Sequence, residues 1–324
     1  MAVLRQTFGA VAACRRSAAG LCIPGMLTME ALAGLLDRHR SSAQARVKEF
    51  SLGDTRFDFN SRPAIMGVVN LSADSWYRES VCLSAESAIR RARVLREQGA
   101  HIVDIGAEST LAHAARLGDE AQSTKLLPIV RELRDAGILV SVETYHASVA
   151  RSALEAGATI LNLTGTQGTG EIFRMAADLG AGVIICYVQG ANVREVGDFD
   201  FVADPISPMQ EYFARQIEIA TRQGLEKLIL DPGLGFYYRN LQDSAVRIGH
   251  QMKVFLNTFR LRSLGFPICH ALPHAFEYFR DEVRSAEPFF AVIAALGKTD
   301  LFRTHEVAKI RAVLDTMAIY QEGA

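Results

Sequence analysis

The apolar positions of this chain form short runs that alternate with longer stretches in which apolar and polar residues mix. This alternation begins beyond Arg46 and continues to the C-terminus. The short runs are apolar on both faces, as parallel strands covered by helices must be. They predict eight strands, over residues 64–69, 101–105, 138–143, 159–163, 182–187, 227–230, 266–272 and 300–303.

The longer stretches predict a helix after each strand, and several end at a glycine, which often terminates helices. These helices cover residues 84–98, 119–136, 148–156, 171–179, 207–223, 241–264, 276–296 and 305–320. Eight such units with no run of strands elsewhere predict a single-domain α/β protein, a (β/α)8 TIM barrel at residues 63–324. An open dinucleotide-binding sheet is disfavoured because no Gly-x-Gly-x-x-Gly follows the first strand.

Two segments precede the barrel. Residues 1–29 carry Arg5, Arg15 and Arg16 but no acidic residue, which fits either a mitochondrial-type presequence or a flexible extension. Residues 30–62 predict a helix at 29–39 and a hairpin at 48–59, which we expect to close the bottom of the barrel rather than form a domain.

Composition narrows the function classes. A formal net charge of −1 over 324 residues argues against nucleic-acid binding, which needs a basic surface. No apolar run approaches the roughly 20 residues that cross a bilayer. Five cysteines without a Cys-x-x-Cys pair suit a reducing compartment. We therefore expect a cytoplasmic protein, or a mitochondrial one if the N-terminal segment is a presequence.

Polar residues fall where the predicted strands end, the edge at which such barrels carry their chemistry. They are Asn70, Asp104, Glu108, Glu143, Asn162, Asp231, His270, His274, Arg303 and His305. Carboxylates accept paired N–H donors, and a carboxamide offers a donor and an acceptor together. Taken alone, each residue is equally well explained as a hydrogen-bonded polar group at the end of the barrel or as a helix cap. Together they predict a site for a flat heterocycle rich in N–H donors, with Arg303 and His305 suited to an anion.

Six segments at these strand ends give a family resemblance: IMGVVNLSADSW (65–76), IVDIGAEST (102–110), VSVET (140–144), ILNL (160–163), LDPGLGF (230–236) and FRTHEV (302–307). In this order they resemble the dihydropteroate synthase family, over roughly residues 50–320. The resemblance implies a TIM barrel, commonly dimeric. Its reaction would condense a dihydropterin pyrophosphate with p-aminobenzoate, and Mg²⁺ would help the pyrophosphate leave.

The resemblance also implies roles for particular residues. Asn162 and Asp231 would hold the pterin edge, joined by Glu143 where the family has Asp. Asn70, Arg303 and His305 would serve the pyrophosphate and metal region, with Asn70 as the Mg²⁺ ligand. The candidates for catalysis are Asp104, which would lie under the pterin, and His274, Arg303 and His305.

The chain departs from the family pattern mainly on the side of the second substrate. The family's Ser-Arg-Lys-Ser becomes Pro273-His274-Ala275-Phe276, and its Arg-Pro-Gly becomes residues 111–113. Aromatic residues accumulate near the expected mouth: Trp76, Tyr77, Tyr187, Tyr237, Tyr238 and Phe276. Loss of a lysine and an arginine removes charge that steadies a leaving pyrophosphate, worth about 3–4 kcal/mol for each such group.

Three functions remain open. The first is an enzyme of altered chemistry that acts on, or with, a reduced pterin or folate. The second is a working dihydropteroate synthase in which His274, Arg78 or Arg116 replaces the lost cations. The third is a non-catalytic pterin-binding or partner-binding relative. We also expect a homodimer.

A transition-metal site is a further hypothesis. His270, His274, His305 and Glu143 could converge, although they come from different strands and lack a local ligand spacing.

Overall fold

The computed structural model describes residues 27–74, 77, 80–109, 116–236, 238–241 and 243–320. Eight parallel strands form one sheet in the order β8-β7-β6-β5-β4-β3-β10-β9, and a bridge between Leu230 and Ile268 joins β8 to β9. The strands are β3 (Ala64–Asn70), β4 (Ile102–Gly106), β5 (Val140–Thr144), β6 (Ile160–Leu163), β7 (Gly182–Cys186), β8 (Leu228–Asp231), β9 (Cys269–Ala271) and β10 (Leu301–Thr304). The predicted TIM barrel is confirmed.

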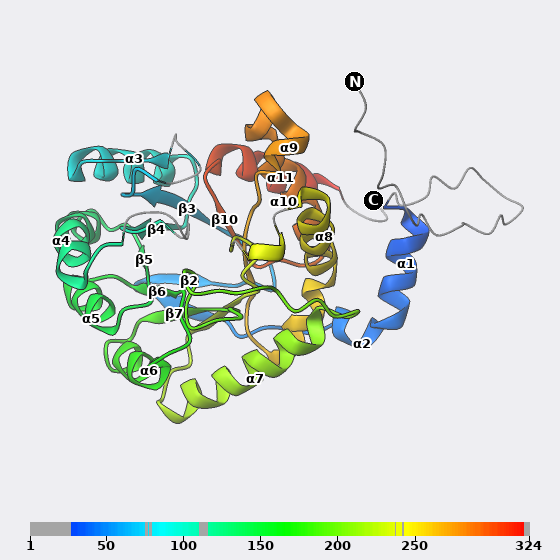
Figure 1. Ribbon diagram of the computed structural model, residues 1–324, viewed down its shortest axis with the longest axis horizontal. Coiled ribbons are helices and arrows are strands. Elements are labelled where there is room, and N and C mark those ends of the chain that lie inside the picture. The colour runs from blue at the N-terminus through cyan, green and yellow to red at the C-terminus, as the bar shows by residue number, and fades with distance from the viewer. Residues whose placement is uncertain are drawn as a thin grey trace, which may run out of the picture.

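Helices surround the sheet (Figure 1). They are α3 (Ala85–Glu97), α4 (Asp119–Asp135), α5 (Ala147–Ala156), α6 (Thr169–Asp178), α7 (Ile206–Arg222), α8 (Ser244–Leu261), α9 (Phe276–Phe279), α10 (Ala286–Leu296) and α11 (Val307–Ile319). Most of their bounds lie within a few residues of the sequence prediction. No helix in the described part of the chain is both long and apolar enough to span a membrane.

One predicted helix is wrong. Residues 276–296 do not form a single helix but comprise α9, a 3-10 segment (Arg280–Ser285) and α10. The break after α9 has a backbone cause, because Arg280 adopts a positive φ of 46°; Ala275, with the same φ, lies immediately before α9. A right-handed helix cannot continue through such residues.

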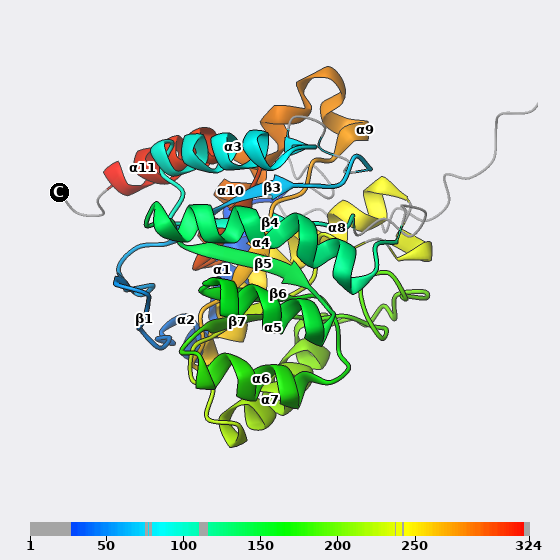
Figure 2. The same cartoon turned by 90° about the vertical axis from the view of Figure 1, so that its left-hand side faces the viewer.

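The segment before the barrel contributes α1 (Met29–Arg38), α2 (Arg40–Ala43) and a hairpin of β1 (Phe50–Leu52) and β2 (Thr55–Phe57). Apolar side chains of the hairpin share a buried cluster with interior residues near the starts of the barrel strands: Leu52, Phe57, Phe59, Ala64, Met66, Ile102, Ile160, Ile184, Ile229, Cys269 and Leu301. Figure 2 shows the hairpin at one end of the strands and α9 at the other. Residues 1–26 of the predicted N-terminal extension lie outside the described residues.

Alternation along the strands decides which side chains reach the barrel interior, because neighbouring residues in a strand face opposite sides. In β4, Ile102 belongs to the interior cluster, whereas Val103 packs with the outer layer of helices. The same alternation puts Asp104 on the inner face. In β10, Leu301 is interior, and Arg303 therefore faces inward beside it.

Candidate functional site

Asp104 is the centre of a buried polar network at the C-terminal ends of the strands. Its side chain is fully buried, and its Oδ2 lies 2.7 Å from Arg303 Nε. Asn162 Nδ2 donates to the same oxygen at 3.2 Å, and Ser141 Oγ donates to Oδ1 at 2.6 Å. Arg303 Nη2 also reaches Glu143 Oε2 at 2.5 Å. Side chains from four strands are thereby held in fixed orientations.

Asp231 completes this floor at the end of β8. Its Oδ1 accepts the backbone N–H of Gly233 at 2.7 Å, and Cys186 Sγ donates to Asn162 Oδ1 at 3.5 Å. One cavity is lined by Glu143, Asn162, Thr164, Cys186, Asp231, Gly233, Gly235, Phe236, Ala271 and Arg303. A ligand in it would meet carboxylate, carboxamide and guanidinium groups within an otherwise apolar wall.

Burial changes the protonation of both floor carboxyls. Removal from water raises the pKa of Asp231 to about 6, against the opposing influence of the Gly233 N–H and Arg303. Burial also raises the pKa of Glu143, opposed by Arg303 and reinforced by the charges of Asp104 and Asp231. The floor therefore holds carboxyl groups that accept a proton more easily than carboxyls in water.

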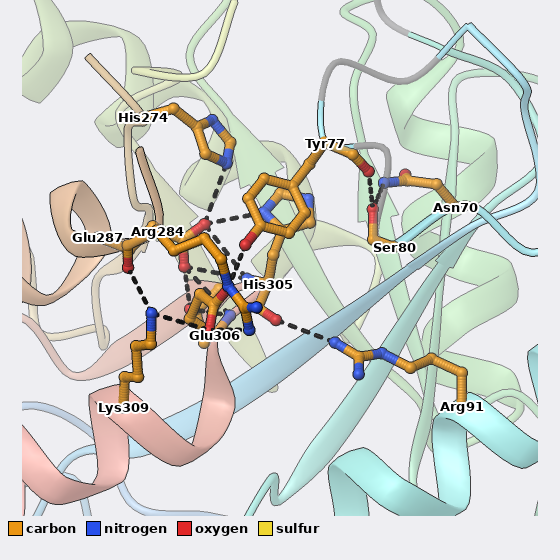
Figure 3. A network of polar contacts seen from close by, with 11 residues as sticks. Asn70, Tyr77, Ser80, Arg91, His274, Arg284, Glu287, His305, Glu306 and Lys309 are labelled. Carbon is orange, nitrogen blue, oxygen red and sulfur yellow. Dashed lines mark hydrogen bonds and ion pairs between the residues drawn. The ribbon is translucent and has the colours of Figure 1, made fainter. Parts of the chain in front are cut away.

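The rim of the barrel mouth contains a second polar cluster, centred on Glu287 of α10. Glu287 Oε1 lies 2.9 Å from His305 Nδ1 and 3.2 Å from His274 Nε2, and its side chain is fully buried (Figure 3). Its Oε2 accepts the hydroxyl of Thr304 and the backbone N–H of His305. Burial opposes ionisation of this carboxyl, but the adjacent imidazoles of His274 and His305 hold the pKa of Glu287 well below its usual range.

Tyr77 covers the two imidazoles. Its ring stacks on His305 with a centroid distance of 4.6 Å and on His274 at 5.0 Å. Its hydroxyl donates to Glu306, which also receives Arg284 Nε at 2.6 Å (Figure 3). The aromatic ring and both histidines are thus fixed in the wall of the rim.

Floor and rim open into one larger cavity, lined by Asn70, Tyr77, Glu108, Ser109, Glu143, Leu234, Gly235, Phe236, Arg247, Gln251, Ala271, Leu272, Pro273, His274, Ala275, Phe276, Arg303 and His305. Asn70 Nδ2 donates to Ser80 Oγ at 2.6 Å, and Ser80 Oγ donates to the backbone oxygen of Tyr77 at 2.8 Å. These bonds tie the end of β3 to the segment that carries Tyr77.

The predicted site residues separate into two groups in space. Asp104, Glu143, Asn162, Asp231 and Arg303 lie together at the floor, and Arg303 contacts carboxylates rather than the histidines. Asn70, His274 and His305 line the wider cavity above them.

Two members of the hypothetical metal set do not join the other two. His270 is buried on the outer side of β9, where its Nε2 lies 2.8 Å from Thr258 Oγ1 of α8. Burial lowers its pKa to about 3. Glu143 pairs with Arg303, so the expectation was wrong for both residues.

The aromatic rim is present only in part. Tyr77 and Phe276 line the cavity, whereas the hydroxyls of Tyr187 and Tyr238 hydrogen-bond Gln189. Trp76, Tyr237, Arg78 and residues 111–113 lie outside the described residues. Arg116, a proposed substitute cation, pairs with the exposed Glu195 at 3.3 Å.

Glu287 and Arg194 are buried charged residues that the sequence reasoning missed. Glu287 is the only acidic residue of the otherwise apolar helix α10, in which Pro288 follows it. A single acidic residue in an apolar helix was the sequence signal that could have identified it. Arg194 has a fully buried side chain, donates to Ser109 O at 2.6 Å and lies 3.5 Å from Glu108 Oε1. No local pattern around Arg194 marks it.

Known proteins of similar sequence and structure indicate the family of this chain. Residues 66–265 match the family model described as pterin binding enzyme. The chain is 32% identical to the dihydropteroate synthase of Synechocystis sp. over 221 residues, which are 67% of this chain and 73% of that protein. It is 28% identical to the dihydropteroate synthase of Bacillus subtilis, over 65% of this chain and 70% of that protein.

Longer relatives and solved structures extend the likeness. A probable bifunctional folylpolyglutamate synthase/dihydropteroate synthase of Haloferax volcanii is 30% identical over 79% of this chain, which spans 30% of that protein. A Xanthomonas albilineans dihydropteroate synthase structure with 4-aminobenzoic acid shares the fold, with a TM-score of 0.71, 23% identity, and coverage of 85% of this chain and 99% of that one. The chain therefore belongs to the family of pterin-binding enzymes that includes the dihydropteroate synthases.

Proposed function

We propose that the floor of the barrel holds the amino-pyrimidinone edge of a reduced pterin through Asp231, Asn162 and Glu143. The observation that carries this proposal is the cavity into which all three side chains project beside Arg303. An ionised carboxylate accepts two N–H donors at once, and the carboxamide matches a donor next to an acceptor. Asp104 acts beneath them by orienting Asn162 and Arg303.

We propose further that the chain is a transferase whose reaction differs from the condensation with p-aminobenzoate. At the rim, the position of the family's lysine is held by Ala275, which is buried and cannot contribute charge. The neighbouring wall is formed by Tyr77, His274 and Phe276, with the His274 and Phe276 rings stacked at 5.3 Å. This surface offers stacking and imidazole chemistry where the family pattern offers lysine and arginine.

A functional dihydropteroate synthase is the second candidate, and the curated relatives favour it because several carry that name. In that case His274 and His305 would supply the polar groups near the leaving pyrophosphate. The carboxamide of Asn70 lines the same cavity and suits Mg²⁺, which prefers oxygen ligands and commonly combines one protein group with substrate phosphates and waters.

Calorimetric titration with a dihydropterin, tetrahydrofolate and methyl-folate tests the pterin site. We expect one of them to bind wild-type protein and to lose at least tenfold in affinity in Asp231→Asn, while the exposed Asp135→Asn leaves binding unchanged. Absence of binding by all three ligands would remove the proposal.

Growth of a synthase-deficient strain on folate-free medium separates the two reactions. An altered reaction predicts no rescue by well-expressed protein that binds pterin in the titration. Rescue would instead establish the second candidate.

A further inference from the structure

We propose that His274, Glu287 and His305 form a binding site for one divalent transition-metal ion of the zinc class. Their three potential ligand atoms all lie within 4.8 Å of one another. The site is separate from the Mg²⁺ position considered at Asn70, and it stands independently of the proposed function because it requires no pterin.

The ligand chemistry suits such an ion. Imidazole nitrogen and carboxylate oxygen are the usual nitrogen and oxygen ligands of zinc, at about 2.0–2.2 Å. Tetrahedral ligands at that distance are about 3.4 Å apart. Glu287 Oε1 already lies 2.9 Å from His305 Nδ1 and 3.2 Å from His274 Nε2. Metal entry therefore requires these two distances to increase by about 0.2–0.5 Å and the two imidazole nitrogens, which lie within 4.8 Å of each other, to approach by up to about 1.4 Å.

The carboxylate is held in the orientation that binding needs. Glu287 Oε2 accepts the Thr304 hydroxyl and the backbone N–H groups of His305 and Glu306, the latter two at 3.1 and 3.3 Å. Oε1 is thereby directed between the two imidazoles (Figure 3). Such support of a ligating carboxylate by hydrogen bonds is typical of metal sites.

One imidazole nitrogen in the cluster is poorly satisfied by protein groups alone. His274 Nε2 is buried and makes no hydrogen bond of acceptable geometry with any described residue, although Glu287 Oε1 lies 3.2 Å away. A buried polar atom without a hydrogen bond is unfavourable, and a metal ion would satisfy it.

The cluster faces the ligand cavity. His274 and His305 line that cavity, whereas Glu287 is fully buried behind them. A metal ion bound by these three groups would have three protein ligands, the number typical of catalytic zinc sites, in which water or substrate takes the fourth position. It would also bring positive charge to the side of the mouth where Ala275 replaces the family's lysine.

Metal titration of chelator-treated protein tests the site, with Zn²⁺ measured after dialysis and Co²⁺ followed by its visible absorption. We expect one ion per chain and a four-coordinate Co²⁺ spectrum. His274→Ala and His305→Ala should each abolish the spectrum and lower affinity at least 100-fold. The matched control is His146→Ala, which removes a histidine paired with Asp119 at 2.9 Å outside the cluster and should bind as wild type does.

Thermal unfolding with and without Zn²⁺ distinguishes metal loss from misfolding, since a ligand that binds the native state raises Tm. The alanine variants should unfold cooperatively but lose the Zn²⁺-dependent rise in Tm. If His274→Ala still bound one metal ion per chain, the ion would lie elsewhere. If the wild-type protein retained no Zn²⁺ after dialysis, the cluster would be a simple ion pair. Either result overturns the proposal.

Discussion

Replacement of Asp104 by asparagine tests the network that supports the floor. The substitution preserves size but removes the charge that faces Arg303 Nε at 2.7 Å. Removal of one partner from a buried ion pair costs about 3–5 kcal/mol. Arg303 still pairs with Glu143, whose Oε2 lies 2.5 Å from Arg303 Nη2. The expected loss in the free energy of unfolding therefore lies below that range, at about 2–3 kcal/mol.

Asp104 also affects the protonation of its neighbour. Its negative charge helps to raise the pKa of Glu143, so Asp104→Asn should lower that pKa and strengthen the remaining pair with Arg303. A large domain loses about 2 °C in Tm per kcal/mol, which predicts a decrease of roughly 4–6 °C. Urea unfolding measures the free energy of unfolding independently of Tm.

A double-mutant cycle with Arg303→Met isolates the pair. Arg303→Met alone leaves both Asp104 and Glu143 without their cation, whereas the double variant leaves only Glu143 unpaired. The double variant should therefore lose less stability than the sum of the single variants, by about 1–3 kcal/mol. Asp135→Asn is the matched control, because Asp135 is 65% exposed in its pair with Arg134 and should change stability by less than about 0.5 kcal/mol. Additive losses within that margin would refute the coupling that we infer.

Three further outcomes follow from the floor and rim. Because burial raises the pKa of Asp231 from 3.8 to about 6, the folded state binds more protons between these values. Stability should therefore fall by about 2–3 kcal/mol from pH 4 to 7, and urea unfolding of Asp231→Asn should lack this component. Gly233→Ala should destabilise the fold by at least about 1 kcal/mol in urea unfolding, since φ is +73° and an added Cβ would lie 2.2 Å from a backbone oxygen. The control Gly249→Ala lies within α8, where an added Cβ meets open space, and should be neutral or stabilising. Tyr77→Phe should lower the free energy of unfolding in urea by about 1 kcal/mol, because the hydrogen bond to Glu306 is lost. Tyr77→Ala also loses the ring stacking on His305 and should cost more. Equal losses would show that the stacking contributes nothing to stability.

The strands and their polar ends were predictable because a parallel barrel imposes a local rule. Each interior strand is an apolar run, and its first polar residues mark the edge that carries chemistry. Asp104, Asn162 and Asp231 were found in this way, and the structure brings them together.

The remaining features depend on information that is not local in sequence. His270 lies one residue before Ala271, yet strand alternation turns it outward to Thr258 while Ala271 lines the cavity. Glu287 meets His305 only because α10 packs beside the end of β10. The positive φ values at Ala275 and Arg280 lack the usual glycine, so no residue type announces them.

A crystal structure with a bound dihydropterin tests the central claim most directly. The account predicts the amino-pyrimidinone edge within hydrogen-bond distance of Asp231 and Asn162, with Arg303 against the same ligand. A pterin bound only at the rim, beside Tyr77 and His274, or outside the barrel mouth would contradict it.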